Sequence, residues 1–274
     1  WTIFLIFIKK ERELVMLCAK DLKVGYEDRI IIDNLNLSIK QGEIVSIIGP
    51  NGCGKSTLLK TLSRMISPIS GKVYLEGTEL KYLKNKLISQ KICLLSQHNQ
   101  APNDLTVEQL VYYGRLPHKK WYEHKSEEDK LFIDWAIEQT GLTRYKDKPI
   151  GSLSGGERQR AYIAQALCQK PTILLLDEPT TYLDISYQLE LMELIQEINK
   201  KLNITVVMVL HELNQASRYR LIIMKQGTII SDGAPNEIID QQTIESVYQI
   251  QCEIDLDPIS NKPRIHPIQT IKSA

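Results

Sequence analysis

The chain has 274 residues and nearly balanced charge, with 34 Lys or Arg against 33 Asp or Glu. A chain of this length buries roughly three quarters of its unfolded surface, so its core needs neither disulfide bonds nor a structural metal. The balanced charge gives no support for nucleic-acid binding, and five scattered cysteines without a C-x-x-C pair argue against a disulfide framework or a zinc site.

The N-terminal stretch differs from the rest of the chain. Residues 1–8 are apolar, but about 20 such residues are needed to span a bilayer. The charged residues 9–13 follow the apolar run, which reverses the order of a signal peptide. Because Met16 directly precedes the first strand-like segment, we interpret residues 1–15 as an extension outside the working domain, residues 16–250. No later segment is apolar and long enough to cross a membrane, so we expect a soluble chain.

Strand patterns come next and lead into a glycine-rich segment. Leu17–Tyr26 and Ile30–Ile39 are typical of strands, and the second alternates as a half-buried antiparallel strand should. The apolar run Ile44–Ile48 predicts a buried strand, and Leu58–Leu62 has helical spacing. The segment between them matches the phosphate-loop pattern G-x-x-x-x-G-K-S/T at every specified position. It consists of Gly49, Pro50, Asn51, Gly52, Cys53, Gly54, Lys55, Ser56 and Thr57.

The chemistry of this loop predicts a bound nucleoside triphosphate, ATP, with Mg²⁺. Its glycines let the backbone approach a ligand closely. Backbone N–H groups at the start of a helix attract phosphate, helped by the helix dipole. Lys55 is placed to reach the β- and γ-phosphates, and the Ser56 hydroxyl is placed to bind Mg²⁺. Cys53 lies inside the loop, so we hypothesise that its alkylation abolishes ATP binding.

The middle and the end of the chain follow different patterns. From His98 to Ile150 strand signals disappear, and helices are predicted at Thr106–Gly114 and Ser126–Gln139, which suggests an inserted helical lobe. Both charge signs crowd His118–Lys130, which is typical of a solvated helix face. After Pro235 two small helices are predicted, and residues 251–274 form a short C-terminal tail. Its loop is expected to contain the prolines at 258, 263 and 267.

Two acidic residues end a later buried strand. Ile173–Glu178 is a run of four apolar residues followed by two acids, which predicts a buried parallel strand. Ligands bind at the carboxyl ends of strands in such sheets, and an acid there holds Mg²⁺ in phosphate-loop proteins. Asp177 is placed for this metal role, and Glu178 is placed to polarise an attacking water.

A second helix start also points to an anion. Ser154 and Glu157 form a capping box. Capping does not explain Gly155 and Gly156, because each glycine is unfavourable in a helix by about 1 kcal/mol relative to Ala. Adjacent glycines suit a helix N-terminus that approaches an anion closely. If both helix starts address one ATP, the second would come from another copy of the chain.

These motifs together resemble the nucleotide-binding subunit of an ATP-binding cassette (ABC) transporter. Leu153–Glu157 is similar to the signature motif of that family. This and the other motifs of the family occur in the family's order over about residues 17–250. They are Tyr26, Gly49–Thr57, Gln97, Leu153–Gln159, Ile173–Glu178, Tyr182–Asp184 and His211. The resemblance implies an α/β fold of the P-loop NTPase type, with a RecA-like core, an antiparallel β subdomain and an inserted α-helical subdomain at about residues 98–150.

The resemblance also implies roles for single residues. Tyr26 would stack on adenine, and Gln97 would contact Mg²⁺ and the attacking water. Glu178 would be the general base, and His211 would contact the γ-phosphate. The signature residues Ser154, Gly155, Gly156 and Glu157 would close over ATP bound by a second copy in a head-to-tail dimer, and Asp184 would bridge the two copies.

Within the family the best local match is to iron(III)–siderophore importers, a subfamily that also handles haem and cobalamin. The match is carried by Gly49–Lys60, Leu105–Val107, Tyr113–His118, Tyr182–Gln188 and His211–Ala216. It implies a peripheral place on the cytoplasmic face of the cell membrane. Two transmembrane permease subunits and, indirectly, a substrate-binding lipoprotein would be the partners, with the lobe around Thr106–Arg115 forming the docking surface.

A non-transport ABC ATPase, associated with ribosomes or chromosomes, is the alternative of another class. Chromosome-organising members carry a long coiled coil between phosphate loop and signature, and ribosome-associated members typically hold two cassettes. This chain has one cassette and only about 100 residues between those motifs. The sequence therefore favours transport.

The chain departs from the family pattern after His211. The segment Gln215–Leu221 lacks about two residues, including an Asp that usually precedes the next strand. Because of this departure, the sequence does not predict how Leu221–Met224 packs.

Overall fold

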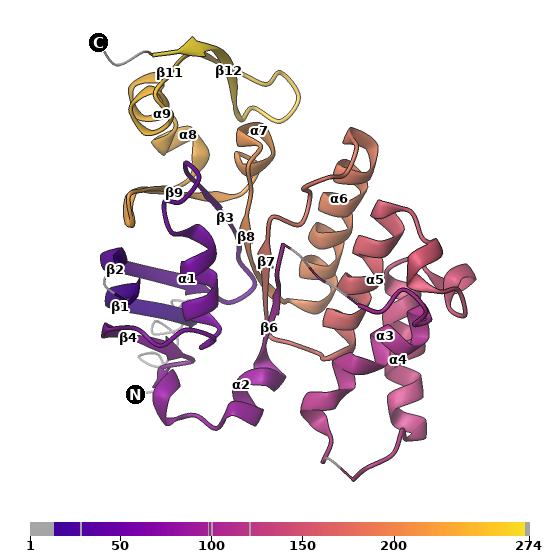
Figure 1. Cartoon of the computed structure of the whole chain (residues 1–274). Coiled ribbons are helices and arrows are strands. Elements are labelled where there is room, and N and C mark those ends of the chain that lie inside the picture. The colour runs from indigo at the N-terminus through magenta and orange to yellow at the C-terminus, as the bar shows by residue number, and fades with distance from the viewer. Residues whose placement is uncertain (1–13, 28, 98, 100, 121, 272–274) are drawn as a thin grey trace, which may run out of the picture.

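The computed structural model describes residues 14–271 apart from 28, 98, 100 and 121. The predicted extension, residues 1–15, lies almost entirely outside the described residues, and so does residue 98, the predicted start of the helical subdomain. Figure 1 shows a central sheet with a second sheet on one side, a group of helices on the other, and the C-terminal segment at one end.

The central sheet holds six strands in the order β10-β9-β3-β8-β7-β6. All neighbours are parallel except β10, which runs antiparallel to β9. Strands covered on both faces read as continuous apolar runs, and every residue of β7 and β8 is buried. The strands are β3 (Ile44–Ile48), β6 (Ile92–Leu95), β7 (Ile173–Asp177), β8 (Thr205–Val209), β9 (Arg220–Lys225) and β10 (Thr228–Gly233).

A second, antiparallel sheet has the order β2-β1-β4-β5. It consists of β1 (Val15–Tyr26), β2 (Arg29–Lys40), β4 (Ser70–Leu75) and β5 (Thr78–Glu79). The predicted alternation in β2 is confirmed, because Leu35, Leu37 and Ile39 are buried. These side chains share one apolar core with α1 (Lys55–Leu62), α2 (Asn85–Lys91) and one face of the central sheet.

The helices cover the other face of the central sheet (Figure 1). They share the second apolar core, which takes in the opposite side chains of the strands. The helices on this face include α3 (Val107–Tyr112), α4 (Glu127–Gln139), α5 (Gly155–Cys168) and α6 (Ile185–Leu202). The predicted helix over Thr106–Gly114 is shorter than expected, because the chain tightens into a 3₁₀-helix at Tyr113–His118. The α/β fold with an antiparallel sheet and a helical insertion is confirmed.

The C-terminal segment contains a β-hairpin, so the prediction of a loop there is wrong. After α7 (Leu213–Ala216), α8 (Pro235–Ile238) and α9 (Gln241–Tyr248), the strands β11 (Ile250–Leu256) and β12 (Pro263–Thr270) pair with each other. Pro263 and Pro267 lie in β12. Proline is tolerated because a two-stranded sheet has only edge strands, whose outward positions need no N–H donor.

The strand after His211 is intact despite the missing residues. In β9, Leu221, Ile222, Ile223 and Met224 are fully buried, and the strand pairs in parallel with β3. Arg220 opens the strand and forms ion pairs with Glu43 (2.9 Å) and Asp232 (2.8 Å). The departure from the family pattern therefore leaves the sheet unbroken.

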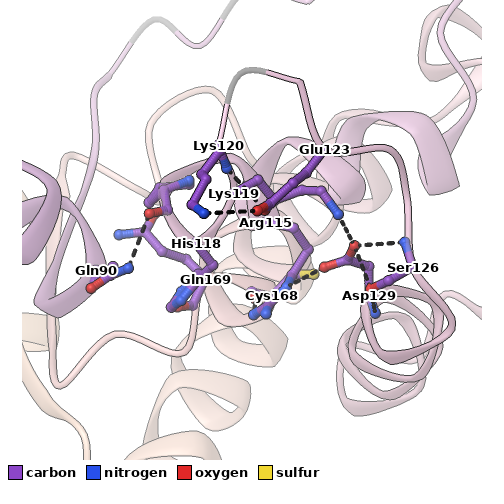
Figure 2. Close-up of polar contacts among 11 residues, drawn as sticks. Gln90, Arg115, His118, Lys119, Lys120, Glu123, Ser126, Asp129, Cys168 and Gln169 are labelled. Carbon is purple, nitrogen blue, oxygen red and sulfur yellow. Dashed lines mark hydrogen bonds and ion pairs between the residues drawn. The ribbon is translucent and has the colours of Figure 1, made fainter.

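Buried charges join the helical lobe to the end of α5 (Figure 2). Arg115 Nε lies 3.1 Å from Asp129 Oδ1, and Arg115 Nη1 donates to the Cys168 carbonyl at 3.0 Å. Lys119 also contacts the Asp129 carboxylate. The side chains of Arg115 and Asp129 are only 7% and 5% exposed. One carboxylate thus holds two cations inside the protein.

One expectation for this region largely holds and another is wrong. Most described residues of His118–Lys130 are exposed, as the charge pattern predicts, but Asp129 is buried and the Lys119 side chain is only 9% exposed. Asp129 turns inward because it caps α4 together with Ser126 and accepts from the Ser126 backbone N–H at 2.9 Å. Arg115 lies inside the lobe, so its side chain is not part of a docking surface.

The Asp129 network leads to a prediction about stability. Burial alone would raise the pKa of the Asp129 carboxyl, but hydrogen bonds from Lys119, Ser126 and Arg115 outweigh burial and hold this pKa well below its usual value. A carboxyl with a lowered folded-state pKa stabilises the fold above about pH 4, and this contribution is lost as the pH falls further. Asp129→Asn should therefore lower the free energy of unfolding at pH 7 by about 3 kcal/mol.

Urea unfolding at pH 7 and at several acidic pH values checks this prediction. Glu128→Gln is the matched control, because Glu128 lies in the same helical turn but is exposed. The control should unfold like the wild type. If Asp129→Asn is as stable as the wild type at pH 7, the network does not hold the lobe in place.

Candidate functional site

A cavity lies at the N-terminus of α1, where the phosphate loop leaves β3. Gly54 precedes the helix with φ of +106°, a conformation that favours glycine. No acidic residue stands in the first turn of α1, so the positive end of the helix dipole is not neutralised there. The cavity has a volume of about 240 Å³ and is lined by Arg29, Ile31, Asn51, Gly52, Gly54, Lys55, Ser56, Thr57 and Glu178. This arrangement is an anion site of the kind that the motif predicts.

The Lys55 amine lies over the loop and is largely buried. Its Nζ donates to the carbonyls of Gly49 (2.7 Å) and Pro50 (3.1 Å), and the residue is 5% exposed. These two bonds hold a positive charge beside the cavity. The position agrees with the predicted role of Lys55 as a ligand of phosphate oxygens, and this role remains a prediction.

Cys53 is buried in the loop at 5% exposure. Burial raises the pKa of its thiol, with a smaller opposite effect from Lys55. Thiolates, not thiols, react with alkylating reagents. We therefore expect iodoacetamide at pH 7 to leave Cys53 unlabelled in the folded protein and to label it after denaturation, as peptide mass spectrometry would show. Rapid labelling of native Cys53 would contradict this account.

Ser56 and Asp177 meet across the site. Ser56 Oγ donates to Asp177 Oδ1 at 2.9 Å, which joins the first turn of α1 to the end of β7. Burial raises the pKa of the Asp177 carboxyl, and the hydrogen bond from Ser56 opposes this shift. A hydroxyl and a carboxylate are hard oxygen ligands of the kind that Mg²⁺ prefers.

Glu178, Gln97 and His211 form a second group beside Asp177. Gln97 Nε2 lies 2.5 Å from Glu178 Oε2, and His211 Nε2 lies 2.5 Å from Glu178 Oε1. The sheet brings them together, because β7 and β8 are neighbours and Asp177 stands opposite Val209. Glu178 has φ of +54°, an uncommon backbone conformation for a non-glycine residue. Such outliers cluster at functional sites.

Tyr26 lies near the cavity but does not line it. The residue ends β1 opposite Arg29, which does line the cavity, and it is 47% exposed. An exposed ring at this edge is free to stack on a base, and the predicted contact with adenine remains a prediction. Arg29 was not among the predicted site residues. Thr181, which donates to Glu178 Oε2 at 3.3 Å, was not predicted either.

The predicted signature forms the start of α5. The capping box is confirmed, because Glu157 N–H donates to Ser154 Oγ (3.2 Å) and Ser154 N–H donates to Glu157 Oε2 (2.8 Å). Ser154 and Gly155 are exposed. Packing within the chain explains the glycine at position 156, because a Cβ there would lie 2.5 Å from the ring of Tyr187. Ser154–Gly155 is therefore the part left open to a ligand.

Asp184 is exposed at the start of α6. Its carboxylate accepts from the Tyr187 N–H at 3.0 Å and so caps the helix. Tyr182, two residues earlier, is 85% exposed and has φ of +66°. This turn projects from the protein, as a bridge to a second copy would require.

The fold and the site together define a phosphate-loop nucleoside triphosphatase. A glycine loop follows the buried strand β3, and two acids end the parallel strand β7. The capping box of α5 adds a second helix start that is exposed to solvent. The residues that line the cavity at α1 do not include this second start.

Comparison with known proteins identifies the family. The model of the "ABC transporter" family matches residues 32–181, and the chain belongs to this family of ATPases. It is 46% identical to the iron(3+)-hydroxamate import ATP-binding protein FhuC of Bacillus subtilis (strain 168), covering 90% of this chain and 93% of the relative. It is 43% identical to the ferric enterobactin transport ATP-binding protein FepC of Escherichia coli (strain K12), covering 91% and 93%.

A solved structure agrees with this result. The dimeric structure of MJ0796, a bacterial ABC transporter cassette, superposes with a TM-score of 0.69 at 31% identity, covering 80% of this chain and 98% of the cassette. Among the helices that the structure describes, none could span a membrane. The family match and the two relatives identify the chain as an ATP-binding ABC subunit.

Proposed function

We propose that this chain is the ATP-hydrolysing subunit of an importer for iron(III)–siderophore complexes. The observation that carries the proposal is the group Glu178, Gln97 and His211, which the sheet places beside the phosphate loop. The two relatives, whose names specify ferric hydroxamate and ferric enterobactin, support the cargo class. The working unit would span residues 16–250, with a helical subdomain at about residues 98–150.

Ser56 and Asp177 fit a Mg²⁺ ion, because their oxygens converge within 2.9 Å between the phosphate loop and the end of β7. When bound there with ATP, Mg²⁺ supplies positive charge that stabilises the phosphates as the bond to the γ-phosphoryl group breaks. Binding of a cation would also offset the effect of burial, which disfavours the charged form of Asp177. Gln97 is proposed as a further contact to the metal.

The chain's own residues would carry the remaining steps. Lys55 and the N–H groups at the start of α1 bind the phosphates. The Glu178 carboxylate accepts a proton from the attacking water, and Gln97 helps to orient that water. His211 contacts the γ-phosphate and, through its 2.5 Å contact, keeps Glu178 in place. Little covalent chemistry is asked of the protein, since positioning and charge account for most of the catalysis of phosphoryl transfer.

The enclosure of ATP would be completed by a second copy. Ser154 and Gly155 form an exposed helix start that no group of the same copy's cavity uses. A head-to-tail dimer places this start over the ATP of the other copy, with Asp184 bridging the pair. The dimeric cassette that superposes on this chain supports such an assembly.

ATP-driven closure and reopening of this dimer would move two transmembrane permease subunits, and the chain would lie on the cytoplasmic face of the membrane. A substrate-binding lipoprotein would deliver the cargo to the permease. The surface of the helical lobe around α3 would form the docking site, without Arg115, which is buried. Nucleic acid has no part in this function.

Uptake of radiolabelled cargo tests the cargo class, with radioactive iron for the ferric siderophores and haem and radioactive cobalt for cobalamin. The gene is disrupted in the source organism, and uptake of ferric hydroxamates, ferric catecholates, haem and cobalamin is measured. We expect loss of at least one ferric siderophore, restored by the wild-type chain but not by Glu178→Gln. Loss of haem or cobalamin alone would assign the importer to that cargo instead. Unchanged uptake of all four would favour a non-transport ABC ATPase.

A further inference from the structure

The first turn of α6 connects two parts of the proposed machinery. The ring of Tyr187 packs against Gly156 at the signature helix, where a Cβ would lie 2.5 Å from the ring. The Tyr187 N–H donates to the Asp184 carboxylate at 3.0 Å. One turn further along, Glu190 forms an ion pair with Arg160 of α5. The start of α6 is thus fixed both to the signature helix and to the turn that faces the second copy.

A chain of two hydrogen bonds leads from this turn to α7. Gln188 Nε2 donates to the Leu183 carbonyl at 2.9 Å. Because a carbonyl only accepts, this bond fixes the orientation of the Gln188 amide and points its Oε1 away from Leu183. That oxygen accepts from Gln215 Nε2 at 2.5 Å. Gln215 belongs to α7 and stands four residues after His211.

The helix α7 depends on such contacts for its position. It has only four residues, Leu213–Ala216, so its own hydrogen bonds cannot hold it in place. Asn214 fixes one side, since its amide donates to the Ile265 carbonyl (3.1 Å) and accepts from the Ile265 N–H (2.8 Å). Gln215 fixes another side through Gln188.

The Gln215 amide is only half satisfied. Its Oε1 is buried and has no donor among the residues that the structure describes. A buried acceptor without a donor raises the free energy of this arrangement. The link between α6 and α7 is therefore a contact that a small displacement of either helix can alter.

We propose that Gln188 and Gln215 are positioning residues for ATP hydrolysis. Their amide pair ties the Leu183–Asp184 turn and the signature helix to α7, so that His211 keeps its contact with Glu178 when the two copies close over ATP. The inference rests on the proposed function. It assigns a role to two side chains that do not line the cavity at α1.

Steady-state ATPase kinetics of Gln188→Leu, Gln215→Leu and the double variant test the proposal. Each single variant should lower kcat about five- to tenfold, as expected when one buried hydrogen bond is lost. KM for ATP should stay at the wild-type value, because the phosphate loop is untouched, and the thermal unfolding midpoint should fall by no more than about 2–4 °C. The double variant should fall no further than the weaker single variant, since both residues act through the same bond.

Two further variants serve as controls. Gln196→Leu removes an amide from the same helix that has no hydrogen-bond partner among the described residues, and it should keep wild-type kcat. Gln188→Glu keeps an acceptor for Gln215 but cannot donate to the Leu183 carbonyl, so it should lower kcat without unfolding the protein. This variant separates loss of the link from loss of packing.

Several outcomes would overturn the proposal. Wild-type kcat in both single variants, a raised KM with unchanged kcat, or multiplicative losses in the double variant would each do so. If the wild type hydrolyses ATP and Glu178→Gln does not, while Gln188→Leu is fully active, only the positioning role fails. A wild-type dimer without ATPase activity would contradict the proposed function itself.

Discussion

Glu178→Gln is expected to bind ATP with wild-type affinity and to hydrolyse it at least about 100-fold more slowly. The amide has the shape of the carboxylate but cannot take a proton from the attacking water. Contacts to Gln97 and His211, both 2.5 Å in the wild type, hold the side chain at the edge of the sheet, so the site should keep its form. Phosphate release measures hydrolysis, and a fluorescent ATP analogue measures binding.

Glu212→Gln is the control for this substitution. Glu212 adjoins His211 and is exposed, so its change should leave hydrolysis unaffected. ATP turnover near the wild-type rate in Glu178→Gln would remove Glu178 as the base. Loss of binding in the same variant would instead show that the carboxylate is needed to shape the site.

Lys55→Ala is expected to weaken ATP binding by at least about 100-fold. The substitution removes a cation whose Nζ lies 2.7 Å from the Gly49 carbonyl, beside the cavity. Charge-assisted hydrogen bonds of this kind contribute about 1.5–3 kcal/mol each, and Lys55 is proposed to make more than one to the phosphates. Isothermal titration with Mg-ATP measures the change.

The fold of Lys55→Ala is checked by thermal unfolding without nucleotide. Lys201→Ala is the matched control, because Lys201 also lies on a helix but is exposed and, within the part of the chain that the structure describes, pairs only with Glu197. The control should bind ATP normally. Wild-type affinity in a folded Lys55→Ala protein would show that the loop does not hold the phosphates as proposed.

The phosphate loop and the sheets could be predicted because their signals are local. The spacing of Gly49, Gly54 and Lys55 needs no tertiary contact to be recognised, and Ile173–Asp177 reads as a buried strand from its composition alone. The capping box of Ser154 likewise lies within one helical turn. Each of these features depends on residues close together in the sequence.

Features that depend on contacts between residues far apart in the sequence were not predicted, or were predicted wrongly, from local patterns. Arg115 and Asp129 form a buried ion pair across fourteen positions, although Arg115 was expected on a docking surface and charge density predicts Asp129 to be solvated. Pro267 stands in β12 because its partner strand lies on one side only, which no local pattern reveals. The contact of His211 with Glu178 requires the order of β7 and β8 in the sheet, which resemblance to a family supplies but spacing does not.

The claim that each ATP site is shared between two copies has a direct test. Lys55→Ala inactivates the phosphate loop of its own copy, and Ser154→Arg blocks the signature helix that serves the other copy. Neither variant alone should therefore hydrolyse ATP. In an equal mixture, half of the dimers contain one intact loop facing one intact signature. The account predicts that mixing restores about a quarter of the wild-type ATPase activity. A mixture as inactive as its two components would contradict the shared site.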